Sequence, residues 1–235
     1  MKKLIYTLLI TAFTLSVKAQ NVKGNNNIET QTRELETYQE IEVIGSLKAN
    51  LVSGTEGSIK ITTDSNLLEY VEAYVKHNKL ILKMKDRISY NSKKGIVIEI
   101  PVQDIEKLSL LGSGDIIGNY TLTDKNLNLT VNGSGDIKLD AKSETIIANV
   151  AGSGDITLTG TTNKLTATVT GSGDIDAKKL KSNEANLTVN GSGDIASLVK
   201  TAVKANVNGS GDIDIYGKTE KVDKKVIGSG SISIK

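Results

Sequence analysis

The stretch Gly-Ser-Gly-Asp-Ile at residues 112–116 recurs through the second half of the chain. Five further copies begin at Gly133, Gly152, Gly171, Gly191 and Gly209, and a seventh copy at Gly228 reads Gly-Ser-Gly-Ser-Ile. Successive first glycines are 21, 19, 19, 20, 18 and 19 residues apart. A near-fixed period of this length predicts a repeat architecture in which each period is one structural unit.

The residues that flank the motif alternate between apolar and polar types. Two positions before the first glycine, every copy has leucine or valine, from Leu110 to Val226. The isoleucine of the motif is present in all seven copies, from Ile116 to Ile232. This alternation predicts one strand that enters the turn and a second short strand that leaves it, each with an inward face. We interpret the remaining, variable residues of each period as the loop to the next unit.

Two architectures fit this pattern, and both are all-β. In a parallel β-solenoid each period of about 19 residues is one coil, whereas in an antiparallel meander the motif forms the tip of a hairpin. We expect the solenoid, with right-handed coils, because one identical turn recurs and the inward positions are aliphatic. Stacked valines and isoleucines fill a narrow interior that large aromatic side chains would not fit.

The motif glycines are predicted to be structural turn residues. A sharp corner requires positive φ, which residues with a Cβ atom resist. In the four central copies these glycines are Gly133, Gly135, Gly152, Gly154, Gly171, Gly173, Gly191 and Gly193.

The motif aspartates would form a column along a solenoid. Like charges ~4.8 Å apart repel by roughly 1 kcal/mol in water, so backbone N–H groups or bound cations must offset the repulsion. We prefer hydrogen bonding within the turn, because Ser231 of the last copy keeps an oxygen but no charge. The less favoured alternative is a metal site, for which the candidates are Asp136, Asp155, Asp174 and Asp194. No metal and no cofactor is therefore expected.

The chain before the repeats divides into three parts. Residues 1–19 read as a secretory signal peptide, with Lys2 and Lys3, an apolar run and a cleavage site after Ala19. Residues 20–37 are a polar N-terminal segment, of which 20–27 are expected to lack fixed structure. Residues 38–111 are predicted to be an irregular β-rich part with a short helix at 66–73, and residues 112–235 the repeat solenoid.

Composition narrows the function classes. The full chain has 29 Lys+Arg and 27 Asp+Glu, and the signal peptide removes Lys2, Lys3 and Lys18, so the mature charge is 26 − 27 = −1. This charge predicts no nucleic-acid partner. The chain has no cysteine, one histidine (His77) and two arginines (Arg33 and Arg87), which predicts no catalytic constellation and hence no enzyme.

The chain resembles the head GIN domain family, a family of unknown function described as auto-transporter adhesins of Bacteroidetes envelope proteins. The resemblance covers Tyr38 to Lys235 and rests on the Gly-Ser-Gly-Asp-Ile copies, on Leu67-Leu68 followed by residues 79–82, and on Ile215-Tyr216-Gly217. It implies a β-helical secreted protein with an adhesive role and without catalytic residues. No anchoring or translocator segment is expected in this chain.

We therefore expect a non-enzymatic protein of the cell envelope that is secreted to the periplasm or outer surface. No membrane span is expected after signal cleavage. Its partner would be a protein or glycan at the cell surface, and a homo-oligomer is compatible with the repeats. Two alternatives stay open: a polysaccharide-active β-helix protein, and a self-assembling structural element of the envelope.

Overall fold

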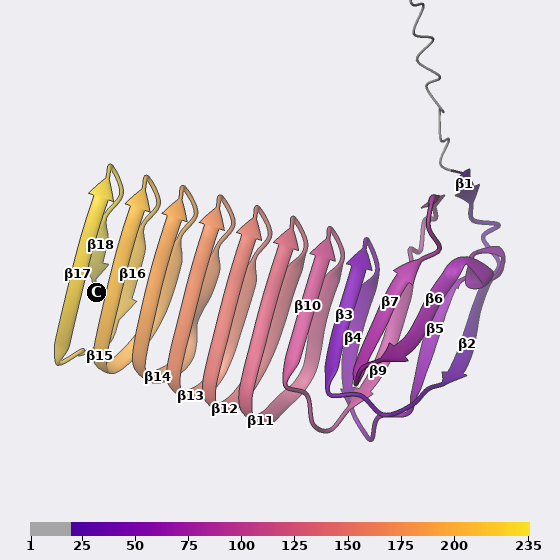
Figure 1. Cartoon of the computed structure of the whole chain (residues 1–235), viewed down its shortest axis with the longest axis horizontal. Coiled ribbons are helices and arrows are strands. Elements are labelled where there is room, and N and C mark those ends of the chain that lie inside the picture. The colour runs from indigo at the N-terminus through magenta and orange to yellow at the C-terminus, as the bar shows by residue number, and fades with distance from the viewer. Residues whose placement is uncertain (1–19) are drawn as a thin grey trace, which may run out of the picture.

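The structure is a computed structural model that describes residues 20–235, and the predicted signal peptide lies outside the described residues. The described chain forms an elongated stack of coils (Figure 1). About 73% of the described residues are in strands and 3% are helical, and the parallel β-solenoid has about 7 turns. The predicted all-β solenoid is thus confirmed, and the meander is wrong.

Five long strands carry the repeats. Each runs from just after one turn to the first glycine of the next: β11 (Asp115–Gly133), β12 (Asp136–Gly152), β13 (Ile156–Gly171), β14 (Ile175–Gly191) and β15 (Ile195–Gly209). Each strand pairs in parallel with the next, and the first turn glycines are in register from Gly112 through Gly209 to Gly228. The predicted loop between units is wrong, because pairing continues around the second corner with only short register shifts.

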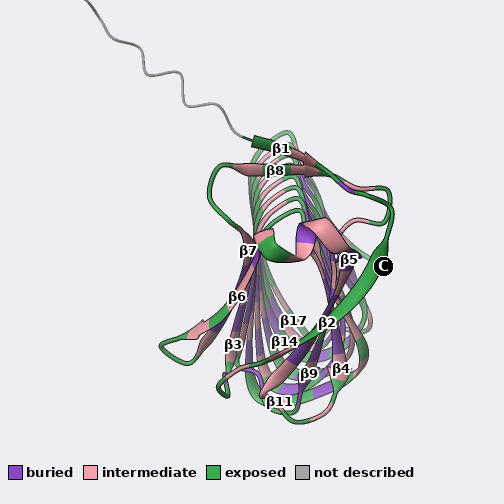
Figure 2. Cartoon of the chain, turned by 90° about the vertical axis from the view of Figure 1, so that its right-hand side faces the viewer, coloured by how far each residue is buried: buried purple, intermediate pink, exposed green. Residues whose placement is uncertain are grey.

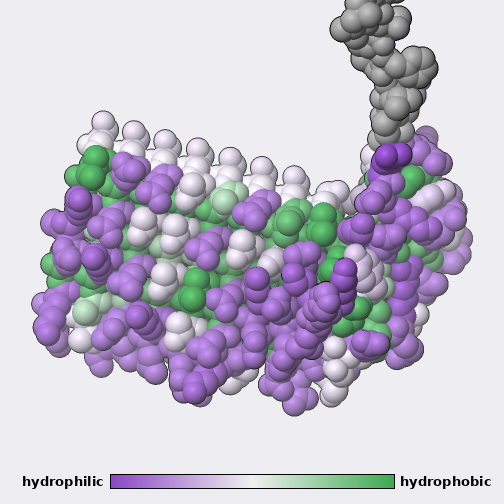
Figure 3. Space-filling view, viewed as in Figure 1, coloured by the Kyte–Doolittle hydropathy of each residue, from purple (hydrophilic) through white to green (hydrophobic). Residues whose placement is uncertain are grey.

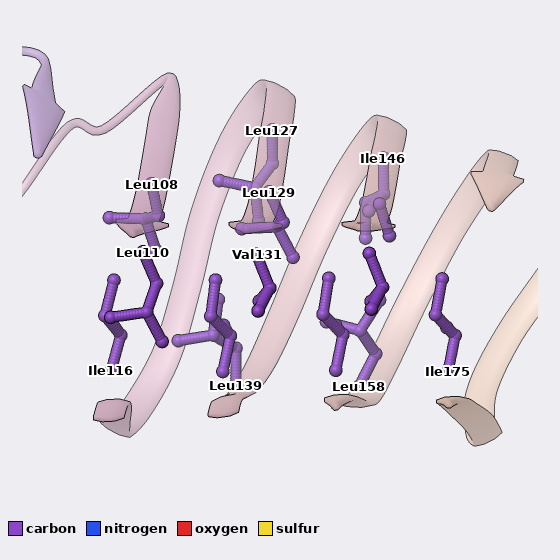
Figure 4. Close-up of a cluster of buried hydrophobic side chains, with 14 of the residues drawn as sticks. Leu108, Leu110, Ile116, Leu127, Leu129, Val131, Leu139, Ile146, Leu158 and Ile175 are labelled. Carbon is purple, nitrogen blue, oxygen red and sulfur yellow. The ribbon is translucent and has the colours of Figure 1, made fainter. Parts of the chain in front are cut away.

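The core is a thin aliphatic layer inside the coils. The valine and leucine column before the turn and the isoleucine column after it are buried through β15, as are Ile213 and Ile215. Figure 4 shows Leu110, Val131, Ile116 and Leu139 packed between the two walls of neighbouring coils. In the burial-coloured view, the buried segments line the interior of the stack (Figure 2). Burial of these columns at each coil interface supplies the main favourable free energy of folding.

The first coils do not follow the chain in order. Strand β10 (Lys107–Gly112) pairs with β3 (Glu40–Gly45), and β11 pairs with β4 (Lys48–Ser53). Beyond that coil lie β7 (Lys79–Met84), paired with β3, and β9 (Val97–Val102), paired with β4. The β3–β4 coil therefore lies between the later β7–β9 coil and the repeats.

The N-terminal end of the stack is closed by antiparallel strands. Strand β2 (Ile28–Glu34) pairs with β5 (Ser58–Asp64), which pairs with β9, and β6 (Val71–Lys76) pairs with β7. Strand β1 (Gln20–Lys23) pairs in parallel with β8 (Ile88–Asn91), and the two form a separate two-stranded sheet. The expectation that residues 20–27 lack fixed structure is wrong, because this strand and the Asp64 carboxylate, which accepts the Asn26 N–H, hold them.

The predicted helix at 66–73 is shorter and of another type. Residues Ser65–Tyr70 form a 3-10 helix, η1, and Val71 already begins β6. Asp64 lies at the N-cap but makes no capping hydrogen bond, because its carboxylate accepts hydrogen bonds from Asn26 and Ser92. The β-branched Val71 and Val75 pair with β7 instead of extending the helix. No helix within residues 20–235 is long and apolar enough to cross a membrane.

The C-terminal coil consists of β16 (Ile213–Tyr216), β17 (Lys221–Gly228) and β18 (Ile232–Ile234). Strand β17 pairs only with β15 among the described strands, and its side chains are almost all exposed. Lys224 occupies a position that is apolar in the other six copies. A lysine on an edge strand opposes edge-to-edge pairing, so Lys224 disfavours the pairing of β17 with a strand of another molecule.

One buried hydroxyl is expected to cost stability. Ser197 is fully buried on β15, in register with Ala177 and Ile215, and its Oγ has no hydrogen-bond partner among the described residues. Ser197→Ala removes this unpaired group and should raise the free energy of unfolding by about 1 kcal/mol. Urea denaturation measures the change, and an equal or lower midpoint for the variant would contradict the hydroxyl's assignment as unpaired.

Candidate functional site

The turns form one long edge of the solenoid, visible in Figure 3 as evenly spaced pale knobs along the upper edge. In each copy the first glycine has positive φ, for example +127° at Gly152 and +124° at Gly171. In the first six copies its carbonyl oxygen accepts two N–H groups from the next coil: Gly133 accepts those of Ser153 and Gly154, at 2.8 and 3.0 Å. The corner is therefore a hydrogen-bonded junction between coils.

The prediction of positive φ is wrong for the second glycine of the motif, at Gly135, Gly154, Gly173 and Gly193. Both glycines nevertheless meet a space requirement. A Cβ atom on Gly152 would collide with the carbonyl oxygen of Gly133, and one on Gly154 with that of Gly135. The same collision arises at all eight turn glycines predicted from the sequence: Gly133, Gly135, Gly152, Gly154, Gly171, Gly173, Gly191 and Gly193. The structure thus places each of them where the backbones of successive coils approach closely.

The motif aspartates are bonded from coil to coil. The Oδ1 atom of Asp136 accepts the N–H of Asp155 at 3.1 Å, and Asp155 accepts that of Asp174 at 2.9 Å. The series continues from Asp174 to Asp194 and Asp212, at 2.8 and 2.7 Å. From Asp136 to Asp212, each carboxylate therefore accepts a backbone N–H from the next coil, which offsets the repulsion between neighbouring charges. Asp115 lies outside this series, because the Asp136 N–H donates to the Gly114 carbonyl oxygen.

The column of motif aspartates is followed at each of its two ends by a residue that is not acidic. Ser231 follows Asp212, to which it donates both its N–H and its hydroxyl. At the other end Lys48 is in register with Asp115. Gly45 and Ser46 precede it, and Gly45 is in register with Gly112, so this coil has an eighth, degenerate turn. The sequence motif is not recognisable in this turn because Leu47 and Lys48 replace the second glycine and the aspartate.

The four metal candidates lie in this column, at Asp136, Asp155, Asp174 and Asp194. Within the described residues, no three or more His, Cys, Asp or Glu side chains are grouped so that they could hold a metal ion. A hollow of about 280 Å³ is lined by acidic residues of the column and by Asp176 and Asp214. Lys178 lies 3.2 Å from Asp176, and Lys235 pairs with Asp214, so cationic side chains already neutralise these two carboxylates.

Other ionisable groups stabilise the fold rather than converge on one site. His77 lies in an exposed turn at φ 50°. Arg33 donates to the carbonyl oxygens of Leu68 and Val71, and burial lowers the pKa of this guanidinium. Burial raises the pKa of Tyr120 to about 12, and its hydroxyl donates to the Val102 carbonyl. Hydrogen bonds from Thr121 and Thr159 lower the pKa of Asp140.

A pair of variants separates the hydrogen-bonding role of Asp174 from its charge. Asp174→Asn keeps an oxygen that accepts the Asp194 N–H and removes one charge from the column, so its stability should equal or exceed that of the wild type. Asp174→Ala removes the acceptor and should lower the free energy of unfolding by about 1 kcal/mol. Thermal unfolding of the two variants checks this order, and an asparagine variant as unstable as the alanine variant would contradict it.

The strands that enter the turns present a second surface, which we name the Asn/Thr face. It consists of the outward side chains one, three and five positions before the first turn glycine in β11–β15, all in register without a shift. The row next to the turns contains Asn132, Ala151, Thr170, Asn190 and Asn208. The middle row contains Thr130, Asn149, Thr168, Thr188 and Asn206. The third row contains Asn128, Ile147, Thr166, Asn186 and Lys204.

The side chains of the Asn/Thr face alternate with the buried core columns. In β13, Thr166, Thr168 and Thr170 are exposed or half-buried, whereas Ala167 and Val169 between them are fully buried. Figure 3 views the molecule from the side on which these strand segments lie, below the row of turns. The face is thus an ordered array of mostly amide and hydroxyl groups. Each coil contributes one side chain to each of the three rows, which run parallel to the solenoid axis.

Comparison with known proteins agrees with this architecture. A family model described as "Putative auto-transporter adhesin, head GIN domain" matches residues 37–219. No curated protein matches the chain.

Solved structures share the fold at low identity. A "putative adhesin" from Bacteroides fragilis is 23% identical, with a TM-score of 0.83 over 91% of this chain and 100% of that one. A "putative lipid binding protein" from Parabacteroides distasonis is 24% identical, with a TM-score of 0.77 over 92% and 100%. A "putative adhesin" from Parabacteroides merdae is 22% identical, with a TM-score of 0.73 over 92% and 100%. By the family model, which matches most of its length, the chain belongs to the head GIN domain family.

Proposed function

We propose that the protein is a non-enzymatic, adhesin-like module of the bacterial cell envelope, which presents solenoid faces to a protein or glycan at the cell surface. The family to which the chain belongs supports the adhesin-like role. The single observation that carries the proposal is the Asn/Thr face, an ordered outward array whose asparagine and threonine side chains make no hydrogen bond to another group of residues 20–235. Solenoids use such extended surfaces for binding.

The arrangement of the ionisable residues supports a role without catalysis. General acid–base chemistry needs titratable groups that converge on one reacting position. Here the motif aspartates accept backbone hydrogen bonds along an edge, and Arg33 is committed to two carbonyl oxygens. The apolar run after Lys2 and Lys3 supports export through a signal peptide.

Cell binding by the mature chain, residues 20–235, tests the proposal. Beads coated with the folded chain should bind to bacterial or host cells several-fold more than beads coated with the same chain after denaturation. Equal binding of the two bead types would contradict an adhesin-like role. A parallel incubation with a panel of polysaccharides should release no reducing sugar ends, and their release would favour a polysaccharide-active enzyme.

A further inference from the structure

The Asn/Thr face is nearly free of charge. It has three positions on each of five strands, and Lys204 is its only charged residue, although 24% of the whole chain is charged. Charges return directly beyond the face, at Lys107 on β10 and at Asp223 and Lys225 on β17. Because a charged partner gains from opposite charges across an interface, this neutral face suits an uncharged partner.

The polar groups of the face are also uncommitted. Within residues 20–235, none of its asparagine or threonine side chains hydrogen bonds to another protein group, in contrast to the aspartate column at the neighbouring edge. Each amide and each hydroxyl can both donate and accept. A partner that is rich in groups that also donate and accept, such as sugar hydroxyls, can pair with every row of the array.

The dimensions of the face argue against a second copy of the chain as its partner. Five strands spaced ~4.8 Å apart, with about six residues of ~3.3 Å each, give an area of about 500 Å². Stable protein–protein interfaces bury ~800 Å² on each partner, so two such faces packed together would give a weak contact. A long, thin partner that runs across the coils does not need an interface as large as that between two proteins, because it gains one set of contacts from each coil.

We propose that the Asn/Thr face binds an extended, uncharged polysaccharide that lies across the strands, parallel to the solenoid axis. An extended β-linked pyranose chain advances per sugar by a length similar to the spacing between coils, so successive sugars meet equivalent residues. Sugar hydroxyls hydrogen bond to the asparagine and threonine side chains, and the apolar side chains of Ala151 and Ile147 contact sugar ring faces. This inference rests on the proposed function and deepens it by naming the ligand class and the face.

Affinity electrophoresis of the mature chain in gels that contain neutral hydroxyethyl cellulose, xylan or galactomannan tests the inference, with acidic alginate as the comparison. At least one neutral polymer should retard the chain, and alginate should not. Thr168→Lys, in the middle row of the central strand, should weaken the retardation at least tenfold. The matched control is Thr157→Lys, because Thr157 lies on the strand that leaves the turn, in register with Lys138 and Asp176, and this variant should bind as the wild type does.

Circular dichroism melts establish that both variants fold. No retardation by any neutral polymer would overturn the inference, as would an equal loss in the two variants. A concentration-dependent dimer that Thr168→Lys abolishes would also overturn it, in favour of a second copy. If Thr168→Lys coated beads still bind to cells as the wild type does, the inference fails while the proposed function stands. If no folded chain binds to cells, the proposed function itself fails.

Discussion

Replacement of Gly171 by alanine is expected to lower the free energy of unfolding by about 2–6 kcal/mol. Gly171 has a φ of +124°, a region that costs a residue with a Cβ atom about 1–3 kcal/mol. The new Cβ would also collide with the carbonyl oxygen of Gly152, and overpacking of this kind costs about 1–3 kcal/mol more. Because the collision is with backbone, a side-chain rotation cannot relieve it.

Denaturant titration of Gly171→Ala beside Ser172→Ala measures this effect. Ser172 is in the same turn and its side chain is exposed, so its replacement should change the free energy of unfolding by no more than about 0.5 kcal/mol. Similar stabilities for the two variants would show that the turn does not require glycine at position 171.

Deletion of residues 153–171, one full period, is expected to leave a folded and shorter solenoid. The deletion joins Gly152 to Ser172, so the motif and both core columns are restored at the junction. Each coil pairs only with its two neighbours, so the loss is one coil and one coil interface. The unfolding midpoint should fall modestly, and the unfolding transition should stay cooperative.

Deletion of residues 153–162, about half a period, should instead abolish the fold. It removes a turn and the isoleucine at position 156, and the remaining residues cannot span one coil. Circular dichroism and size-exclusion chromatography compare the two deletions. A folded half-period variant, or a full-period variant as damaged as the half-period one, would contradict the parallel solenoid.

The repeated part of the fold was predictable because one backbone requirement recurs in it. The glycine pairs fix the corner, and the valine and isoleucine columns identify the inward face on either side of it. For each motif aspartate, the type of hydrogen-bond donor was predictable, but the residue that supplies it was not. A backbone N–H was expected, but the donor is that of the equivalent residue one coil away, as between Asp155 and Asp174, and not one within the same turn.

The first coils were less predictable because their contacts join segments in an order that differs from the chain order. Strand β3 pairs with β10 on one side and β7 on the other, and no local pattern encodes this insertion. The degenerate turn at Gly45 lost its signature through Leu47 and Lys48. The predicted short helix was too long at its C-terminal end, because the valines at 71 and 75 also satisfy helical spacing. Antiparallel pairing with β7 determines their conformation instead.

The Asn/Thr face had a weak signal in the sequence. Its residues appeared only as the polar partners in an alternating strand, since neutral side chains such as Thr168 and Asn149 form no recognisable motif. Only the register of five strands shows that they make one array without acidic residues. A search for charge-free outward columns across aligned repeats would have found it.

We interpret the Gly-Ser-Gly-Asp motif as a hydrogen-bonded corner and not as a cation site. Calorimetric titration of Ca²⁺ into the mature chain, with Asp174→Asn as the matched control, distinguishes the two. We expect no stoichiometric heat for either protein and no rise in melting temperature with Ca²⁺. Stoichiometric heat for the wild type that decreases in Asp174→Asn would contradict it, because the aspartate column would then bind metal.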